Sequence, residues 1–434
     1  RRALFLPKRL ARPLSTVTGP NIVRAGWNAD AMNVTFDDGS EHSYHHFWLR
    51  DHCAACFHPT THQRLVDTLS IPMDLTPSSI EVSNDRVRCT WSPDKEGSEE
   101  GHISEFSAQF LYNAAYATPR DFAHARSTAP DGFGLQSDLR AVSFPDGVSL
   151  WGCGMTERVH TFEHDRFMTK EGEFRDAMAY LWRYGFLVCK GAPTTIEATR
   201  AFAERIGFPR QTFYGTMWDT KMPEPEAAAD IVDTAYTSLE LKPHTDGTYF
   251  SDPPALQMFN CAASASQGGH TWLVDGFNAA LQLFHEDPAA FHFLACHEVP
   301  WHHTDEQGNQ LLARGPVLGV RHMSAHDELQ MTSLRLNNDD RATVTFSATD
   351  MEQFYLSLQH LLRITRDDRN AFELLLEPGT ILIVNNDRVM HGRRAFEGPG
   401  RNLLGCYMGR DEFESALRRA GVLPDNKLML PMPC

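Results

Sequence analysis

The chain places a histidine and an aspartate two residues apart, His244 and Asp246, inside the stretch YTSLELKPHTDGTYF. In a β-strand, residues i and i+2 point to the same face, so this imidazole and carboxylate can bind one metal ion together. One more distant histidine would complete the 2-His-1-carboxylate ligand set of a non-haem Fe(II) oxygenase, which leaves open positions for a co-substrate and O2. We therefore look for a sheet scaffold and a third ligand.

The same His-x-Asp spacing occurs at two other places, as expected by chance among 21 histidines and 56 acidic residues. His285 and Asp287 lie in an apolar-periodic run that is typical of a helix, where residues i and i+2 diverge on the surface. His303 and Asp305 lie in the polar, Gly-containing segment WHHTDEQGNQ, which we interpret as a loop. Only His244 has aromatic strand patterns on both sides, and it is the preferred metal ligand.

The third ligand is predicted to be His391, in the segment GTILIVNNDRVMHGRRAF. Residues 381–384 are typical of a buried strand and follow a Pro-Gly turn, so His391 is expected just past a strand. Arg401 follows ten residues later, before the apolar segment 403–408. Its guanidinium can bind the remote carboxylate of a dicarboxylate co-substrate through two hydrogen bonds. In the alternative interpretation, His391 is a core residue and Arg401 a surface charge.

Six motifs together resemble one known family: FYGTMW, DTAYT, HTDGTYF, VDGFNAA, LNNDDRA and VMHGRRAF. They are similar to those of the γ-butyrobetaine and trimethyllysine hydroxylases, 2-oxoglutarate- and Fe(II)-dependent dioxygenases of carnitine biosynthesis. The resemblance extends from about residue 48 to about residue 409. It implies Fe(II) bound by His244, Asp246 and His391, 2-oxoglutarate held by Arg401, and a homodimer. Ascorbate is expected as the reductant that keeps the iron reduced.

The resemblance also implies an aromatic cage for a quaternary ammonium group. Such a group cannot donate a hydrogen bond, so proteins recognise it with aromatic faces. Four residues match the cage positions of the family: Tyr214, Trp218, Tyr236 and Tyr407. Without the resemblance, each of these side chains would be interpreted as an ordinary core aromatic.

Asp233 favours trimethyllysine over γ-butyrobetaine as the substrate. Trimethyllysine carries an α-ammonium beside its carboxylate, whereas γ-butyrobetaine ends in a carboxylate alone. The trimethyllysine hydroxylases resemble this chain in having Asp at this position, where the butyrobetaine enzymes have an amide. Asn337 and Asn338 are expected to receive the carboxylate that both substrates share. We expect 3-hydroxylation of N6,N6,N6-trimethyllysine, the first step of carnitine biosynthesis; γ-butyrobetaine hydroxylation is the alternative, and Asp233 would then cap a turn or pair with an arginine.

Two other functional classes remain as alternatives. A non-catalytic reader would use the cage to bind methyl-lysine on a protein and would retain only a vestigial metal face. A hydroxylase of the taurine type would act on an anion, and would require basic residues where this chain has Tyr and Trp. The net charge of −16 suits a cationic substrate and argues against nucleic acid as a partner. Membrane insertion is not expected, because no run of about eighteen apolar residues occurs.

Residues 25–115 are predicted to form a small β domain with a metal site. Five short strand-like runs are separated by turn signals: 33–36, 43–48, 79–82, 87–91 and 103–106. Cys53-x-x-Cys56 has the spacing of a zinc knuckle, and His102 follows the next hairpin. The family carries a structural zinc here, held by three Cys and one His, but this chain keeps only two of the Cys, and Cys53 aligns with either of two family positions. The missing ligand is one of His52, His58, His62 or Cys89, unless the site is empty.

The first 24 residues have the composition of an organellar transit peptide. They are rich in Arg and in Ser or Thr, and no acidic residue precedes Asp30. A disordered basic tail is the alternative. The nine cysteines form an odd, scattered set, which indicates a reducing intracellular compartment rather than a disulfide framework. We therefore expect a mitochondrial matrix location, with the cytoplasm as the alternative.

The remainder of the chain is predicted to be a linker, residues 116–150, followed by the dioxygenase domain, residues 151–434. Helices are expected at 174–184, 195–206 and 275–297, and a strand at 185–191. Periodicity alone gives only a mixture of helix and strand. The resemblance implies a mainly β fold with flanking helices, a double-stranded β-helix or jelly roll whose open mouth holds the iron.

Overall fold

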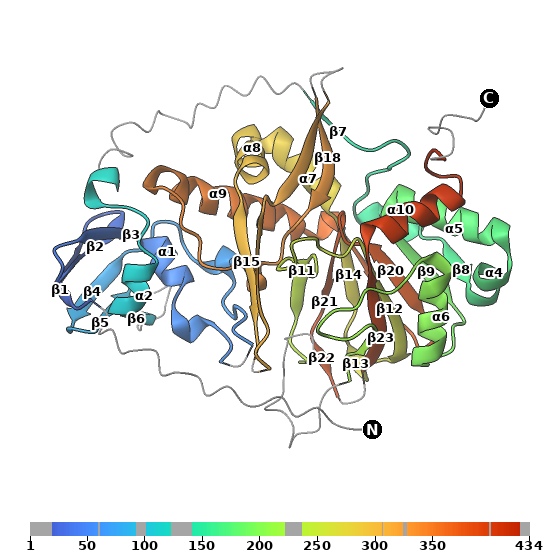
Figure 1. Ribbon diagram of the computed structural model, residues 1–434, viewed down its shortest axis with the longest axis horizontal. Coiled ribbons are helices and arrows are strands. Elements are labelled where there is room, and N and C mark those ends of the chain that lie inside the picture. Colours follow the sequence, from blue (N-terminus) through green and yellow to red (C-terminus); the bar gives the residue numbers. More distant parts are fainter. Residues whose placement is uncertain are drawn as a thin grey trace, which may run out of the picture.

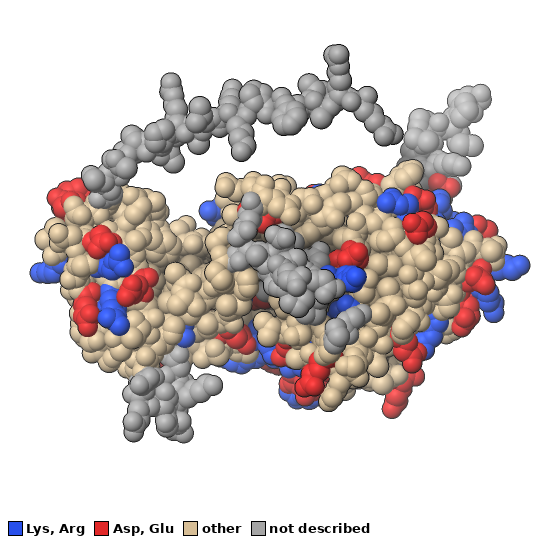
Figure 2. Space-filling view, turned by 90° about the horizontal axis from the view of Figure 1, so that it is seen from below, with Lys and Arg blue, Asp and Glu red and all other residues tan. Residues whose placement is uncertain are grey.

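The computed structural model describes residues 20–59, 61–92, 101–122, 141–221, 237–305, 307–323, 328–398 and 401–425. The molecule is elongated, with a small β domain at one end and a larger sheet domain at the other (Figure 1). A group of helices and hairpins lies between them. On the face drawn in Figure 2, basic and acidic side chains are interspersed. No described helix combines the length and the apolar character needed to cross a membrane.

The N-terminal domain contains two antiparallel three-stranded sheets. The first is β1 (Ile22–Trp27), β2 (Ala31–Phe36) and β3 (Glu41–His45), and the second is β4 (Pro77–Val82), β5 (Arg86–Trp91) and β6 (Ile103–Ser107). Two short helices, α1 (His46–Asp51) and α2 (Ala108–Asn113), follow β3 and β6. Four of the five predicted runs lie within strands. The prediction for 43–48 was wrong beyond His45, whose ring caps α1 by accepting a hydrogen bond from the Phe47 amide.

Two sheets form the larger domain, and the predicted jelly roll is confirmed. The larger has the order β10 (Trp218–Asp219), β23 (Asn402–Met408), β12 (Leu256–Ala263), β20 (Ile381–Asn385), β9 (Phe186–Lys190) and β8 (Thr161–Glu163). The smaller has the order β11 (Leu241–His244), β21 (Val389–Arg393), β14 (Thr271–Asp275) and β19 (Ala371–Leu374). Leu273 of the smaller sheet shares one buried cluster with Phe259 and Leu382 of the larger. Burial of these apolar side chains holds the two sheets together.

Four helices cover the outer face of the larger sheet (Figure 1). They are α4 (His164–Thr169), α5 (Glu171–Tyr184), α6 (Ile196–Ile206) and α10 (Arg410–Arg419). The α5 and α6 predictions are confirmed, and Thr195 caps α6 by accepting the Ala198 amide. Helix α5 ends at Gly185, which has a φ of 78°. A side chain there would also approach Val389 to 2.6 Å, so glycine is required.

Among the described residues, the middle of the molecule contains three helices and two hairpins. The helices are α7 (Gly276–Glu286), α8 (Pro288–Cys296) and α9 (Ala348–Thr365). The hairpins are β15 (Val299–Thr304) with β16 (Gln310–Gly315), and β17 (Leu318–Met323) with β18 (Glu328–Leu334). His285 is helical as predicted, but His303 lies in β15 rather than in a loop, because its strand pairs with β16. Strand β7 (Val142–Ser143) pairs with β18, so the range predicted as linker contains a strand.

A buried polar network joins the N-terminal domain to the rest of the molecule. The carboxylate of Asp51 accepts hydrogen bonds from Arg341 at 2.7 Å and from the Tyr355 hydroxyl at 3.0 Å. Arg64 lies 3.2 Å from the same carboxylate. Burial opposes ionisation, but the charges of Arg341 and Arg64 outweigh it and hold the pKa of Asp51 below its usual range. Breaking one member of such a network leaves a buried charge unpaired, so the two parts are fixed to one another.

Candidate active site

Strand pairing brings the three predicted iron ligands together. His244, the last residue of β11, lies directly opposite His391 of β21. As expected, His391 follows the strand predicted at 381–384, which is β20, and it is itself inside the next strand, β21. Asp246 follows β11 in a turn, with its Oδ1 atom 3.1 Å from His244 Nε2 and 3.8 Å from His391 Nε2. The three ligand atoms all lie within 4.8 Å of one another, as binding of a single ion requires.

Hydrogen bonds orient two of these side chains. The Nδ1 atom of His244 is 2.7 Å from the Lys242 carbonyl, to which it donates, so its Nε2 atom is directed towards Asp246. The Oδ2 atom of Asp246 accepts the Tyr407 hydroxyl at 2.7 Å and the amide of Gln257. The Asp246 backbone is held by Asn386, whose side chain accepts its amide at 2.8 Å and donates to its carbonyl at 3.0 Å. The Oδ1 atom of Asp246 therefore faces the imidazole rings of His244 and His391.

The electrostatics of the site fit a metal cation. Burial and the nearby His244 lower the pKa of His391 to about 3, so this imidazole is neutral, the form that binds metals. Burial opposes the charge on His244, but its hydrogen bond with Asp246 and the charge of Asp246 raise its pKa to about 9. The proton of His244 thus lies between its own Nε2 atom and Oδ1 of Asp246. A metal ion that binds these two atoms would displace this proton. The Nδ1 atom of buried His391 has no hydrogen-bond partner among the described residues.

A pocket opens over these ligands, and three of the predicted cage residues line it. Tyr214, Trp218 and Tyr407 come from the segment before β10, from β10 and from β23. The rings of Trp218 and Tyr407 lie 5.8 Å apart, and Trp218 packs over Gly405, where any side chain would collide with it. Tyr236 lies outside the described residues. Sequence reasoning missed Tyr249, which lines the pocket with its hydroxyl 3.0 Å from that of Tyr214.

Arg401 also lines the pocket. Its side chain is buried and lies over the ring of Phe396, with 5.5 Å between the guanidinium carbon and the ring centroid. Burial lowers its pKa. No carboxylate within the described ranges pairs with it. An unpaired buried cation is costly, so this position is suited to an anionic ligand.

The two asparagines predicted to bind substrate point in different directions. Asn337 lines the pocket, but its amide is used by the loop itself, donating to Asp340 at 2.8 Å and accepting the Asp339 amide at 3.1 Å. Asn338 does not line the pocket. It is buried against the N-terminal domain, where it donates to Thr68 at 3.0 Å, so the prediction of direct substrate contact was wrong for this residue. Asp233 lies outside the described part of the chain.

Residues 157–407, more than half of the chain, match the model of the taurine catabolism dioxygenase TauD, TfdA family. The chain belongs to the TauD/TfdA dioxygenase family. Residues 24–112 of this dioxygenase match a second model, gamma-butyrobetaine hydroxylase-like, N-terminal, which coincides with the small β domain. The enzyme is a 2-oxoglutarate- and Fe(II)-dependent dioxygenase, as the resemblance implied.

Curated relatives of this dioxygenase align over most of its length. Trimethyllysine dioxygenase, mitochondrial, from Bos taurus is 32% identical and covers 87% of this chain and 83% of the relative. Trimethyllysine dioxygenase from Meyerozyma guilliermondii is 29% identical and covers 91% of this chain and 95% of the relative. Among solved structures, AAD-2 in complex with Mn(II) and N-oxalylglycine is 16% identical, covers 55% of this chain and 89% of its own, and has a TM-score of 0.42.

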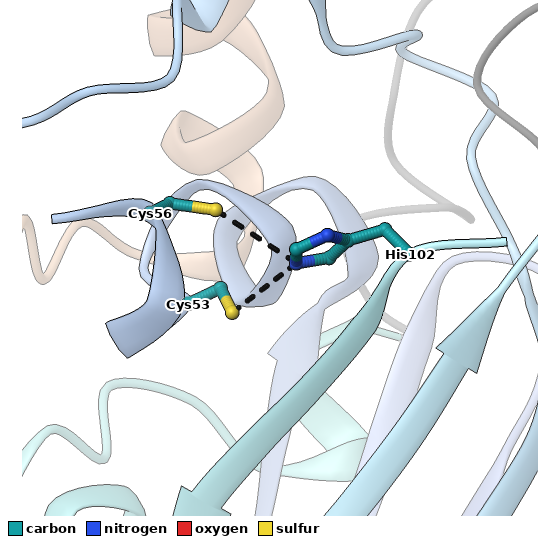
Figure 3. A group of neighbouring side chains, drawn as sticks. All are labelled: Cys53, Cys56 and His102. Carbon is teal, nitrogen blue, oxygen red and sulfur yellow. Dashed lines mark hydrogen bonds between the residues drawn. The ribbon is translucent and has the colours of Figure 1, made fainter.

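A second potential metal centre of this dioxygenase lies in the N-terminal domain (Figure 3). Cys53 precedes the short 3-10 helix η1 (Ala54–Cys56), Cys56 ends it, and His102 reaches them from the start of β6. The Nε2 atom of His102 is 3.3 Å from the Cys53 sulfur and 3.8 Å from the Cys56 sulfur. Hydrogen bonds from Cys56, Ser104 and His102 outweigh burial and lower the pKa of Cys53, which favours the thiolate form that binds metals.

The fourth ligand of this centre is not found among the described residues. Of the four predicted candidates, His52 is bonded through Nδ1 to the Trp48 carbonyl at 2.8 Å. The Cys89 sulfur packs against Met32 in the core at 3.8 Å. His58 accepts the Thr61 amide at 3.2 Å, and neither it nor His62 joins the described group of three. The residues that the structure describes therefore provide three ligands.

Proposed function

We propose that this dioxygenase hydroxylates N6,N6,N6-trimethyllysine at C3, the first step of carnitine biosynthesis. One observation carries the proposal: the pocket that contains the His244, Asp246 and His391 face is lined by the aromatic rings of Tyr214, Trp218 and Tyr407. Aromatic faces attract a quaternary ammonium group, whereas an anion, as in the taurine-type alternative, would require cations there. Relatives named trimethyllysine dioxygenase support the same substrate.

Each side chain has a distinct role in this proposal. His244, Asp246 and His391 hold Fe(II) on one face, and Arg401 binds the remote carboxylate of 2-oxoglutarate. Bound iron and 2-oxoglutarate supply the oxidising chemistry, in which O2 is consumed and succinate and CO2 are released. Tyr214, Trp218 and Tyr407, with Tyr236 predicted from its motif, hold the trimethylammonium group. The apolar walls exclude water, and Asp233 remains a predicted partner of the α-ammonium.

Further parts of the proposal concern assembly and location. Residues 25–115 and 151–434 are proposed as the two domains, and a homodimer and ascorbate as reductant follow from the resemblance. A mitochondrial matrix location is proposed, and its mitochondrial part is supported by the Bos taurus relative, whose name includes the word mitochondrial. The predicted transit segment, residues 1–24, lies almost entirely outside the described residues.

The wild-type enzyme should convert trimethyllysine faster than γ-butyrobetaine. Mass spectrometry of reactions with Fe(II), 2-oxoglutarate and ascorbate should show one added oxygen on trimethyllysine, with one succinate per product. We expect kcat/KM to be roughly tenfold or more higher for trimethyllysine, as one charge-assisted hydrogen bond to its α-ammonium provides. Faster turnover of γ-butyrobetaine would assign that activity instead. Binding of both betaines without succinate release would identify a methyl-lysine reader.

We also propose that Cys53, Cys56 and His102 hold a structural zinc ion. Thiolate and imidazole are the ligands that zinc prefers, and their spacing is that of a zinc knuckle. Arg50 donates to the Cys56 sulfur at 3.0 Å, but the hydrogen bond with Cys53 and burial outweigh it and raise the pKa of Cys56. Binding of zinc would therefore release the Cys56 proton. Four protein ligands would leave no open position, so such an ion would stabilise the fold rather than take part in catalysis.

Replacing Cys56 with serine should remove this zinc. We expect about one zinc per chain in the wild type by elemental analysis, and little in the variant, because a hydroxyl binds zinc far more weakly than a thiolate. Cys153→Ser is the matched control, since Cys153 is an exposed cysteine away from the site, and it should keep the metal. Equal zinc content in the wild type and in Cys56→Ser would contradict the site.

A further inference from the structure

Asp339 presents an unsatisfied carboxylate to the active-site pocket. It lies in the short 3-10 helix η6 (Asn338–Asp340) and lines the pocket together with His244 and Asp246. Its side chain is half-buried. No group in the described ranges forms a hydrogen bond or an ion pair with this carboxylate. Its position was not recognised from the sequence, where LNNDDRA indicated only the two asparagines.

The neighbouring carboxylate of Asp340 is bonded quite differently. It accepts hydrogen bonds from Gln63 at 3.1 Å, from Thr248 at 3.2 Å and from Asn337 at 2.8 Å. Asp340 thus serves as a structural anchor of the loop, with its acceptor sites already used. The contrast between two adjacent acids indicates that Asp339 is reserved for a group that is absent from the chain itself.

The cations that act on Asp339 are paired with other carboxylates. His244, Arg64 and Arg366 all stabilise its charge. Each of them is already paired with another carboxylate: His244 with Asp246, Arg64 with Asp51 and Arg366 with Asp67. Burial therefore dominates and raises the pKa of Asp339 to about 6. A carboxylate in this position gains stability from a cationic ligand.

The loop around Asp339 is held rigidly by the N-terminal domain. The Arg64 amide donates to the Asp339 carbonyl at 3.2 Å, and the Arg64 side chain donates to the Asn338 carbonyl at 3.4 Å. The Asn337 side chain accepts the Asp339 amide at 3.1 Å. Because these contacts fix the backbone, the carboxylate is positioned before substrate binds, which reduces the entropic cost of binding.

We propose that Asp339, in addition to the predicted Asp233, binds the α-ammonium group of the amino-acid substrate and is a specificity-determining residue of this enzyme. The inference rests on the proposed function and deepens it. An α-ammonium carries N–H donors and gains a charge-assisted hydrogen bond from a carboxylate. A trimethylammonium group has no N–H donor and gains more from aromatic faces, which in this pocket are Tyr214, Trp218 and Tyr407. The two cationic ends of trimethyllysine therefore match two chemically different parts of one pocket.

Two substrates that differ only in the α-amino group test this proposal. They are trimethyllysine and 6-(trimethylammonio)hexanoate, which keeps the carboxylate and the trimethylammonium group. We expect Asp339→Asn to reduce the ratio of their kcat/KM values by roughly tenfold or more, as loss of one charge-assisted hydrogen bond predicts. The change should appear in KM for trimethyllysine, while values for the analogue stay close to wild type. Asp339→Ser should reduce the ratio in the same way as Asp339→Asn. Neither variant should unfold the loop, because no described residue is bonded to the Asp339 carboxylate.

Asp252→Asn is the matched control for removal of a negative charge. Asp252 is an exposed carboxylate outside the active-site pocket, 3.6 Å from Arg210, and its variant should keep the wild-type ratio. An unchanged ratio in Asp339→Asn would overturn the proposal, as would an equal loss for both substrates, which indicates a structural role. The proposed function is tested separately with the wild-type enzyme. If the wild-type enzyme does not hydroxylate trimethyllysine, the proposed function itself is contradicted.

Discussion

Replacing Asp246 with alanine is expected to abolish 2-oxoglutarate-dependent succinate formation. The carboxylate lies between His244 Nε2 at 3.1 Å and His391 Nε2 at 3.8 Å, and it supplies the only negative charge of the ligand set. Without it, two neutral imidazoles remain to hold a divalent cation in a desolvated site. We expect a loss of about a thousandfold or more in turnover, equivalent to roughly 4 kcal/mol. Succinate release and the iron content of the purified variant measure the effect.

Asp287→Ala is the matched control for this variant, because it alters a second His-x-Asp pair of the same chain. Asp287 caps α8 by accepting the Ala290 amide at 2.9 Å and is not part of the active-site pocket. Its loss should lower the free energy of unfolding by about 1 kcal/mol and leave turnover intact. Undiminished succinate formation by Asp246→Ala would refute the assignment of the ligand.

Double replacement of Tyr214 and Trp218 by leucine is expected to raise KM for trimethyllysine by roughly 30- to 1000-fold. Both aromatic rings line the pocket, and two desolvated cation–π contacts together contribute about 2–4 kcal/mol. Leucine keeps the walls apolar but removes the negative ring faces. Tyr407 is left unchanged because its hydroxyl also supports Asp246 at 2.7 Å. Steady-state kinetics with each substrate varied in turn provide the measurement.

The same kinetics contain an internal control. KM for 2-oxoglutarate should stay close to wild type, because Arg401 is not altered. Trp27→Leu offers a matched aromatic replacement on β1 of the N-terminal domain, where the ring is 46% exposed, and it should leave both KM values unchanged. If the double variant retained the wild-type KM for trimethyllysine, the cage would be excluded.

The sequence by itself determined the local features of this protein. The 3.6-residue periodicity of α5 and α6, with Gly185 and Thr195 at their ends, depends on neighbours within a few residues. The apolar run of β20 is similarly local. Because metal ligation needs particular residue types, His244, Asp246 and His391 were also recognisable from their motifs, although the strand that contains His391, β21, was not predicted.

Only the tertiary structure decided how these parts combine into a site. The pairing of β11 with β21 places His244 opposite His391, and the carboxylate between them is oriented by Gln257, Asn386 and Tyr407. These contacts join residues that are far apart in the chain, so no local sequence pattern predicts them.

The same reason explains the two acids and two asparagines of LNNDDRA. Asn338 is turned towards Thr68, and Asp339 towards the pocket, because the N-terminal domain packs on one side of the loop. Adjacent residues of similar chemistry thus acquire opposite roles from what surrounds them. Hydrogen-bond partners and burial, which distinguish a structural amide from a substrate-facing carboxylate, exist only once the two domains are in contact.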